Sequence, residues 1–187
     1  MKEEIQKAFS ILQKGGVILY PTDTIWGIGC DAENQKAVDR IYKIKKRIEG
    51  KSLLVLVDSF ERISRYVKKI DPVIIDLVLG YNKPLTVIYP GAINVAKGVS
   101  APDKTIGIRV VRDEFCKKLI NEFGHAIVST SANISGEASP VVFQQIADEI
   151  KNAVDYAVNI NRSVIASMRP SRIIRVFPNG GFEVVRE

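Results

Sequence analysis

The feature that most constrains the fold of this chain is a set of short apolar runs without polar residues at alternate positions. The clearest is LLVLV at residues 53–57, and VILY at 17–20 is a second short run that Pro21 ends. A strand exposed on one face alternates between apolar and polar residues, whereas a strand covered on both faces is apolar throughout. The run at 53–57 therefore predicts a strand inside a sheet that is covered on both sides.

Helical and strand patterns alternate along most of the chain. Ile5, Ala8, Phe9 and Leu12 fall at helical spacing and predict a first helix that ends at 15–16. The predicted helices cover residues 2–14, 35–46, 59–67, 72–79, 113–123 and 142–150. The predicted strands cover 17–20, 53–57, 85–89, 105–111, 126–129, 156–158, 171–177 and 182–185, and Asn179, Gly180 and Gly181 form a turn before the last one. This order predicts an α/β sheet, partly parallel and partly antiparallel, with helices packed on it.

Length and composition set further bounds. The 187 residues fit one domain better than two, so we expect a single domain over 1–187. No apolar run approaches the ~20 residues that cross a bilayer, and the N-terminus lacks the basic start of a signal peptide. Cys30 and Cys116 are far apart, which argues against a disulfide framework and favours a reducing cytoplasm.

The formal net charge of +6 has two explanations at this stage. An anionic partner such as a nucleotide or RNA would account for it. A lysine-rich solvated surface would account for it equally well. Where the charged residues lie in the fold distinguishes an anionic partner from a solvated surface.

Three polar stretches adjoin predicted strands, beside which open α/β sheets bind ligands. PTDTIWGIGCD at 21–31 suits a small polar ligand, although an ordinary turn is the simpler explanation of its composition. KIKKRIEGKS at 43–52 places five cations in nine positions, which fits either a triphosphate or a solvated helix end. STSANISGEAS at 129–139 offers hydroxyl and N–H donors to phosphate or ribose, or is a polar loop without a ligand.

Several catalytic mechanisms are poorly supported by the sequence. It contains neither a GxxxxGK[ST] phosphate loop nor a GxSxG nucleophile elbow. The single histidine, His125, has no acidic neighbour in sequence, so a Ser-His-Asp triad or a histidine metal site is improbable. The remaining hydroxyls, cations and backbone groups suit substrate positioning and charge stabilisation better than covalent catalysis.

Taken together, the three stretches resemble the YrdC/TsaC family of threonylcarbamoyl-adenylate synthases. The family's PT-[DE]-T-aromatic-G-hydrophobic-G motif is matched by Pro21 to Gly29. Its KxR motif is matched by Lys45-Lys46-Arg47, and its SxN motif by Ser131-Ala132-Asn133. The resemblance covers nearly the whole chain and implies the YrdC-like fold, an open, mixed and twisted sheet with helices packed on it.

The resemblance also implies an activity. Members condense L-threonine, bicarbonate and ATP, with Mg²⁺, into threonylcarbamoyl-AMP and pyrophosphate. The proteins of a tRNA threonylcarbamoyl-transferase complex then modify an adenosine of tRNA. The implied localisation is cytoplasmic, and a direct contact with tRNA or double-stranded RNA is a further expectation.

Carried over position by position, the resemblance implies a role for each matching residue. Lys45 and Arg47 would grip the phosphates and serve catalysis. The threonine would contact Thr22, Arg109, Ser129 and Ser171. The nucleotide would contact Lys45, Arg47, Thr105, Ser131, Asn133, Ser139 and Arg186. The sequence itself supports Arg109, because an arginine on an apolar strand is costly unless paired, while Ser171 and Arg186 fit a surface hairpin equally well.

The chain departs from the family pattern at three loop-shaping prolines, where it has Ile48, Ser52 and Val111. Their absence puts the rigidity of the loops in doubt more than the chemistry. Two other hypotheses remain open: a double-stranded RNA-binding module without turnover, and a related carbamoyl-transfer enzyme with a different acceptor. The RNA-binding hypothesis leaves the threonine-rich and hydroxyl-rich loops unexplained.

Overall fold

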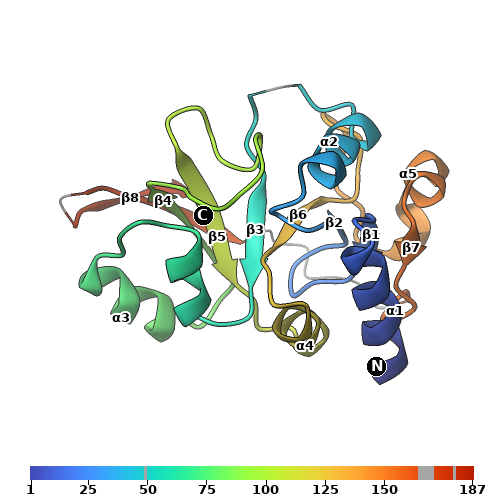
Figure 1. The fold of residues 1–187 in the computed structure, drawn as a ribbon, viewed down its shortest axis with the longest axis horizontal. Coiled ribbons are helices and arrows are strands. Elements are labelled where there is room, and N and C mark those ends of the chain that lie inside the picture. Colours follow the sequence, from blue (N-terminus) through green and yellow to red (C-terminus); the bar gives the residue numbers. More distant parts are fainter. Residues whose placement is uncertain (49, 164–170, 179) are drawn as a thin grey trace.

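The computed structural model describes residues 1–48, 50–163, 171–178 and 180–187. Its described strands form one nine-stranded sheet in the order β7-β1-β2-β6-β3-β5-β4-β8-β9 (Figure 1). Their bounds are β1 Ile18–Tyr20, β2 Gly27–Gly29, β3 Leu54–Val57, β4 Leu85–Pro90, β5 Thr105–Val110, β6 Ile127–Ser131, β7 Tyr156–Ala157, β8 Arg172–Val176 and β9 Phe182–Arg186. The sheet is mixed, since β1 with β7, β3 with β5 and β4 with β8 are parallel and the other pairs antiparallel.

Helices surround this sheet. Their bounds are α1 Lys2–Gln13, α2 Gln35–Ile44, α3 Pro72–Gly80, α4 Glu114–Phe123 and α5 Asp148–Ala153, with 3₁₀ turns at Glu61–Arg65 and Phe143–Gln145. The side chains of Asn34 and Asp113 cap the starts of α2 and α4, as short polar residues do at helix N-termini. None of the described helices is long and apolar enough to span a membrane. The predicted mixed α/β fold is confirmed.

The sheet separates two apolar clusters, and alternate residues of β1, β3 and β6 point to opposite clusters. On β3, Val55 and Val57 belong to the larger cluster and Leu56 to the smaller one. Apolar residues of α2, α3 and α5 pack into the larger cluster, whereas α1 and α4 supply the smaller one. The prediction that residues 53–57 are covered on both faces is therefore correct.

The smaller cluster covers only part of its face of the sheet. In Figure 1, α1 lies at the right and α4 below the centre, while β4, β8 and β9 extend to the left. Leu54 packs against the smaller cluster and also lines a cavity of about 420 Å³. Beyond Leu54, none of the helices that the structure describes adds apolar residues to this face, and the cavity opens there.

The structure corrects three of the predicted elements. Residues 59–67 contain a 3₁₀ turn instead of an α-helix. The helix predicted over 142–150 is two short pieces, because Ile146 and Ala147 adopt extended conformations and Ile146 is buried in the core. The stretch 21–31, interpreted as a loop, contains strand β2. The predicted hairpin is present between β8 and β9, although Asn179 of its turn lies outside the described residues.

Strand β2 depends on Gly29. A Cβ atom on Gly29 would lie 2.5 Å from the carbonyl oxygen of Val128 and 2.6 Å from the ring of Tyr20. Both contacts are shorter than any ordinary Cβ contact, and one of them is with backbone that cannot swing away. The glycine therefore lets β2 sit between β1 and β6, which explains why a glycine stands at this position of the motif.

We predict that Gly29→Ala destabilises the fold by about 2 kcal/mol or more, because overpacking a tight interior typically costs 1–3 kcal/mol. Urea unfolding monitored by circular dichroism measures this loss. The matched control is Gly80→Ala at the end of α3, where a Cβ atom meets nothing within 4 Å. Equal stability of the two variants would contradict the role given to Gly29.

Candidate functional site

A cavity of about 420 Å³ occupies the uncovered part of the sheet face. Nine of the eleven predicted site residues line it: Thr22, Arg47, Thr105, Arg109, Ser129, Ser131, Ser139, Ser171 and Arg186. They come from six separate segments of the chain. The fold therefore brings most of the sequence-predicted residues together around one space.

The floor of the cavity follows from strand register. Leu54 on β3 lies opposite Gly107 on β5 and opposite Ser129 on β6. Gly107 lies in turn opposite Ile88 on β4. Directly paired residues share a face of a sheet, and all of these residues line the cavity. The same alternation sends Ile106 and Ile108 into the larger apolar cluster on the other face.

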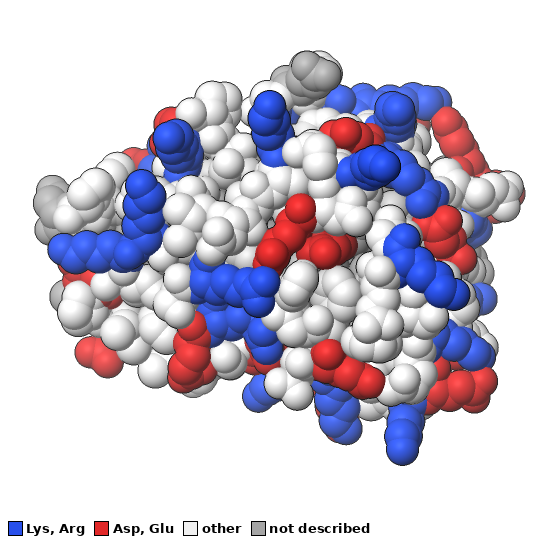
Figure 2. Space-filling model, viewed as in Figure 1, with Lys and Arg blue, Asp and Glu red and all other residues white. Residues whose placement is uncertain are grey.

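The charge of the cavity wall is predominantly positive. Arg47, Arg109, Arg175 and Arg186 line it, and Asp103 is the one acidic residue among the described lining residues. Hydrogen bonds from Thr105, through its hydroxyl and its backbone N–H, lower the pKa of Asp103. On the face drawn in Figure 2, by contrast, Lys and Arg are interspersed with acidic residues. The cavity thus presents a local excess of cations to an anionic ligand.

Arg109 is the most deeply buried of these cations, with 4% of its side chain exposed. One terminal nitrogen donates to the Thr24 hydroxyl at 3.0 Å, and the other lies 3.2 Å from Oδ1 of Asp23. The Nε atom is buried and has no hydrogen-bond partner among the described residues. An arginine held in this way on a rigid strand suits bidentate binding of a carboxylate.

Arg47 secures the loop that follows α2. Its Nε donates to the carbonyl oxygen of Lys51 at 3.1 Å, and a terminal nitrogen donates to that of Ser52 at 2.7 Å. The Tyr42 hydroxyl also donates to the Lys51 carbonyl, at 2.6 Å. These hydrogen bonds hold the loop that contains Ser52, the residue at which the family often has a proline.

Lys45 and Asn133 are the two predicted residues that are not part of the cavity wall. Lys45 is 1% exposed, and its Nζ donates to the carbonyl oxygens of Ser131 and Asn133 at 2.5 and 2.6 Å. Burial, with a smaller contribution from the charge of Arg47, lowers the pKa of Lys45 to about 8. Asn133 donates to the carbonyls of Ile134 and Glu137. Lys45 and Asn133 therefore hold the backbone of the SxN loop through hydrogen bonds to its carbonyls.

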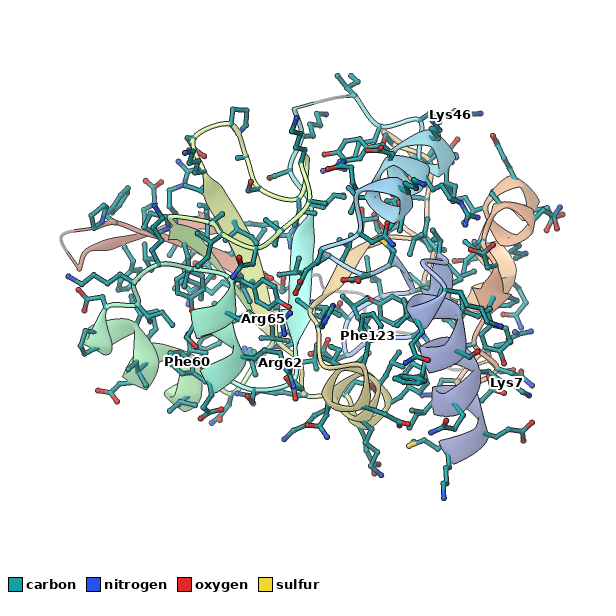
Figure 3. The ribbon with its side chains drawn as sticks, viewed as in Figure 1. Lys7, Lys46, Phe60, Arg62, Arg65 and Phe123 are labelled. Atoms are coloured by element: carbon teal, nitrogen blue, oxygen red, sulfur yellow. The ribbon has the colours of Figure 1, made fainter. Side chains whose placement is uncertain are left out.

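Lys46, the middle residue of the KxR motif, lies away from the cavity. It is exposed, and Figure 3 shows it at the end of α2 on the outside of the molecule. Its Nζ pairs with Glu149 of α5 at 2.9 Å. Only one of the three residues of this motif, Arg47, lines the cavity.

The hydroxyl groups of the wall hold one another in place. Thr22 Oγ1 donates to the carbonyl of Ile25 at 2.7 Å and accepts from the N–H of Thr24 at 3.1 Å, so it braces the turn of the first motif. Ser171 is buried, and its hydroxyl lies 2.8 Å from that of Thr86. These bonds fix the hydroxyls before any ligand arrives.

A β-bulge places Arg186. It lies opposite Ile173, whereas Ile174 lies opposite Val184, so one extra residue of β9 lies between the two pairs. The shift turns Arg186 to the cavity face, where it donates to the carbonyl of Ser171 at 2.7 Å. Arg186 is the last residue of β9, one position beyond the predicted end of that strand.

Sequence reasoning missed several polar residues of the wall: Thr24, Ser52, Thr86, Asp103 and Arg175. Thr86 interrupts the apolar run of β4, and Arg175 interrupts the apolar residues 173–176 of β8. A polar residue on an apolar strand is the signal that identifies Arg109, and the same signal could identify Thr86 and Arg175. Asp103 and Ser52 lie in loops, where alternation gives no information.

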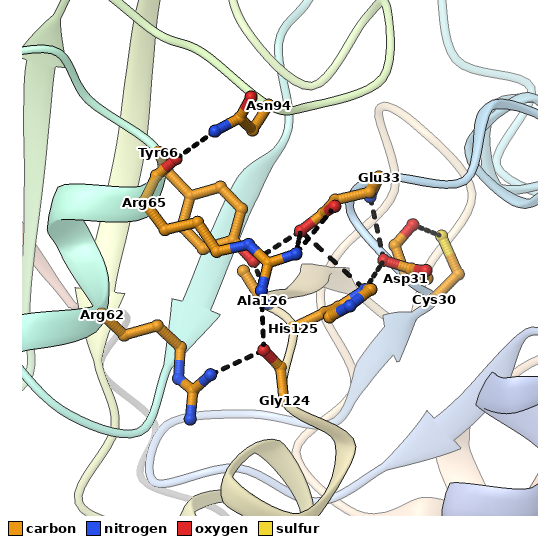
Figure 4. A network of polar contacts seen from close by, with 10 residues as sticks. All are labelled: Cys30, Asp31, Glu33, Arg62, Arg65, Tyr66, Asn94, Gly124, His125 and Ala126. Carbon is orange, nitrogen blue, oxygen red and sulfur yellow. Dashed lines mark hydrogen bonds and ion pairs between the residues drawn. The ribbon is translucent and has the colours of Figure 1, made fainter.

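The single histidine lies in a network outside the cavity wall (Figure 4). His125 Nδ1 lies 3.4 Å from Oδ1 of Asp31 and 3.8 Å from Oε1 of Glu33. Glu33 also pairs with Arg65 and accepts from the Tyr66 hydroxyl. This network joins the segment between β2 and α2, the 3₁₀ turn after β3 and the segment before β6. Within the described part of the chain, no three His, Cys, Asp or Glu side chains are arranged to hold a metal ion.

Two curated proteins with similar sequences carry the same name. A curated protein of Pseudoalteromonas translucida, named threonylcarbamoyl-AMP synthase, is 33% identical over 158 residues, which cover 83% of this chain and 84% of that protein. A protein of Saccharophagus degradans with the same name is 34% identical over 178 residues, covering 88% of this chain and 90% of the relative.

Solved structures share the fold. E. coli YciO aligns with a TM-score of 0.82 and 26% identity, covering all of this chain and 90% of YciO. P. abyssi Sua5, solved in complex with L-threonine, aligns with a TM-score of 0.86 and 24% identity. This chain spans about half the length of that Sua5, covering 54% of it.

The family model for Sua5, YciO and YrdC proteins, described as telomere recombination, matches residues 10–187. That match spans nearly the whole chain and includes all three motifs. Together with the relatives at 33% and 34% identity, it establishes that the chain belongs to the Sua5/YciO/YrdC family and confirms the resemblance of its motifs.

Proposed function

We propose that this chain is a threonylcarbamoyl-AMP synthase, which condenses L-threonine, bicarbonate and ATP into threonylcarbamoyl-AMP and pyrophosphate. Curated relatives that match most of the chain carry this name. The observation that carries the proposal is the cavity itself, where four arginines and a series of fixed hydroxyls line one space on the sheet. Such a site suits a reaction between anions.

The buried arginine is the proposed receptor for the threonine carboxylate. Arg109 lies at the floor of the cavity, and its planar guanidinium matches a carboxylate in bidentate geometry. Ser129, Ser171 and Thr22 line the same space and would contact the rest of the amino acid. A methyl-bearing, hydroxyl-bearing substrate fits walls that combine Ile88, Ile173 and these hydroxyls.

The triphosphate would occupy the part of the cavity bordered by Arg47 and Arg186. Thr105, Ser131 and Ser139 line the wall and can donate hydroxyl hydrogens to phosphate or ribose oxygens. In the proposed reaction bicarbonate takes up a proton and splits into carbon dioxide and water. The neutral threonine amine then adds to the carbon dioxide and loses one proton, which gives the carbamate. An oxygen of the resulting carbamate attacks the α-phosphorus, and the bond from that phosphorus to the bridging oxygen breaks as pyrophosphate leaves.

Catalysis in this proposal is positioning and charge stabilisation. Arginine cations near the phosphates stabilise the charge that develops on the leaving pyrophosphate. The Asp103 carboxylate is the one acid in the described cavity wall, and the described residues include no group of three His, Cys, Asp or Glu side chains arranged to hold a metal ion. Mg²⁺ would therefore enter as the complex with ATP, since this ion is commonly bound through substrate phosphates, and there it would neutralise phosphate charge.

Other parts of the proposal extend beyond the cavity. We propose that residues 1–187 act as one domain in the cytoplasm and that the product passes to proteins that transfer the threonylcarbamoyl group to tRNA. A direct contact with tRNA or double-stranded RNA is the companion proposal, motivated by the net charge of +6. RNA binding without pyrophosphate release would favour the binding-module alternative.

We expect pyrophosphate release only when threonine, bicarbonate and ATP are all present. Coupled phosphate detection measures release, and mass spectrometry identifies threonylcarbamoyl-AMP. Omission of each substrate in turn is the control. Release that persists without threonine or without bicarbonate would contradict the proposed reaction, and a different carbamoylated product would identify another acceptor.

We predict that Arg47→Ala and Arg109→Ala each reduce kcat/KM by roughly 10- to 100-fold, the effect of losing one or more charged hydrogen bonds. Arg47→Ala should chiefly affect ATP, and Arg109→Ala chiefly threonine. Steady-state kinetics with each substrate varied separately makes the comparison. Arg112→Ala, which removes an exposed arginine just beyond β5, is the control. Wild-type kinetics in either cavity variant would contradict its role.

We predict that Lys45 acts through the SxN loop and does not grip phosphate directly. Lys45→Met removes the ammonium donor from the carbonyls of Ser131 and Asn133, and among the described residues only the Ser131 carbonyl keeps a hydrogen bond, from the N–H of Asn133. We expect this loss to cost about 1–3 kcal/mol. Faster amide hydrogen exchange over residues 131–137 and a higher KM for ATP should accompany that loss. Lys43→Met, at an exposed position of α2, is the control. Weaker ATP binding with unchanged stability and exchange would indicate direct contact instead.

A further inference from the structure

One buried charge near the cavity has no part in the mechanism so far. Asp23 lies between the two threonines of the first motif, and 12% of its side chain is exposed. Its Oδ1 lies 3.2 Å from a terminal nitrogen of Arg109. Asp23 itself is not part of the cavity wall, although Thr22 and Thr24 on either side of it are. The carboxylate therefore approaches Arg109 without lining the cavity.

The contact between the two residues is an ion pair with unused hydrogen-bonding capacity. Neither carboxylate oxygen of Asp23 has a hydrogen-bond partner among the described residues, and the same is true of Arg109 Nε. An ion pair that contributed the most to stability would give each of these atoms a hydrogen-bond partner, because a buried polar group without a partner lowers the free energy of unfolding. Asp23 thus neutralises Arg109 without occupying all of its donors.

The other charges near Arg109 increase the need for neutralisation. Arg186 lines the same cavity, and burial together with the charge of Arg109 lowers the pKa of Arg186. Within the described structure, Asp23 is the one acidic residue that forms an ion pair with Arg109. An empty cavity without Asp23 would hold Arg109 as a buried cation with no counterion, which is strongly unfavourable.

We propose that Asp23 is a built-in counterion that moderates the affinity of Arg109 for the substrate carboxylate. It is a positioning residue, because it acts through Arg109. The inference rests on the proposed function, in which Arg109 receives the carboxylate of threonine. Asp23 keeps the arginine neutralised while the cavity is empty, and it offsets part of the attraction when the carboxylate binds. The carboxylate that the product retains is then released more readily.

This inference makes a prediction opposite in sign to that of a merely structural role. If Asp23 only held Arg109 in place, removal of its charge would weaken threonine binding. If Asp23 is a competing counterion, the same change strengthens binding, because the ligand carboxylate becomes the main partner of Arg109. The isosteric variant Asp23→Asn removes the charge and keeps the shape.

The experiment is calorimetric titration of L-threonine into the full chain, wild type and Asp23→Asn. We expect the dissociation constant of the variant to fall by roughly tenfold, the size of effect of one unit charge a few ångströms away at a partly buried site. The melting temperature without ligand should fall at the same time. Asp39→Asn, an exposed position on α2, changes the net charge equally and should leave both quantities unchanged. Unchanged or weaker binding in Asp23→Asn would overturn the inference.

A second measurement separates this inference from the proposed function. If the wild-type chain does not bind threonine, the proposed substrate is wrong, and the ion pair is then tested by stability alone. Arg109→Met leaves Asp23 as an uncompensated charge, so the double variant Asp23→Asn/Arg109→Met should be less destabilised than the sum of the single variants. Strictly additive losses, or failure of the double variant to fold, would contradict the counterion role.

Discussion

The structure depends on the two-sided character of its sheet. Every central strand places one set of alternate residues into the larger apolar cluster, and this face is covered by α2, α3 and α5. The opposite set meets α1 and α4 over only part of its length. Because the covered face supplies most of the apolar burial, the uncovered face is free to carry Gly107, Arg109 and Ser129. The fold is thus stabilised on one side of the sheet and binds ligands on the other.

This arrangement explains why the polar groups of the site are so fixed. Strands that are packed on one face cannot shift their register without exposing their apolar residues. The hydroxyls of Thr86 and Ser171 contact each other, and Arg109 is held by Thr24 and Asp23. Loops complete the wall, and hydrogen bonds to their backbone carbonyls hold them in place. Lys45 donates to carbonyls of the SxN motif, and Arg47 donates to a carbonyl of the loop after α2. Preorganised groups of this kind lose little entropy when a charged ligand binds.

Much of this organisation could be predicted from the sequence, for identifiable physical reasons. Apolar runs gave the central strands, and Asp113 and Gly124 marked the ends of α4 because capping chemistry is local. Arg109 was recognisable because a charge on an apolar strand requires a partner. The sequence does not predict strand β2 because its three residues include two glycines, which are poor strand formers. The need for Gly29 arises from Tyr20, Ile127 and Val128 on the neighbouring strands.

The positions of Lys45 and Arg186 mark the limit of such predictions. Both residues were identified from motifs, yet a motif does not indicate which way a side chain points. Lys45 lies at the C-terminal end of α2 and turns toward the carbonyl of Ser131 at the end of β6, a contact over 86 residues of sequence. Simple alternation would place Arg186 on the same face as Val184, and the bulge at Val185 of β9, opposite the step from Ile173 to Ile174, reverses it. A single extra residue in an edge strand thus decides whether an arginine faces the ligand, because a shift of one residue exchanges the two faces of a strand.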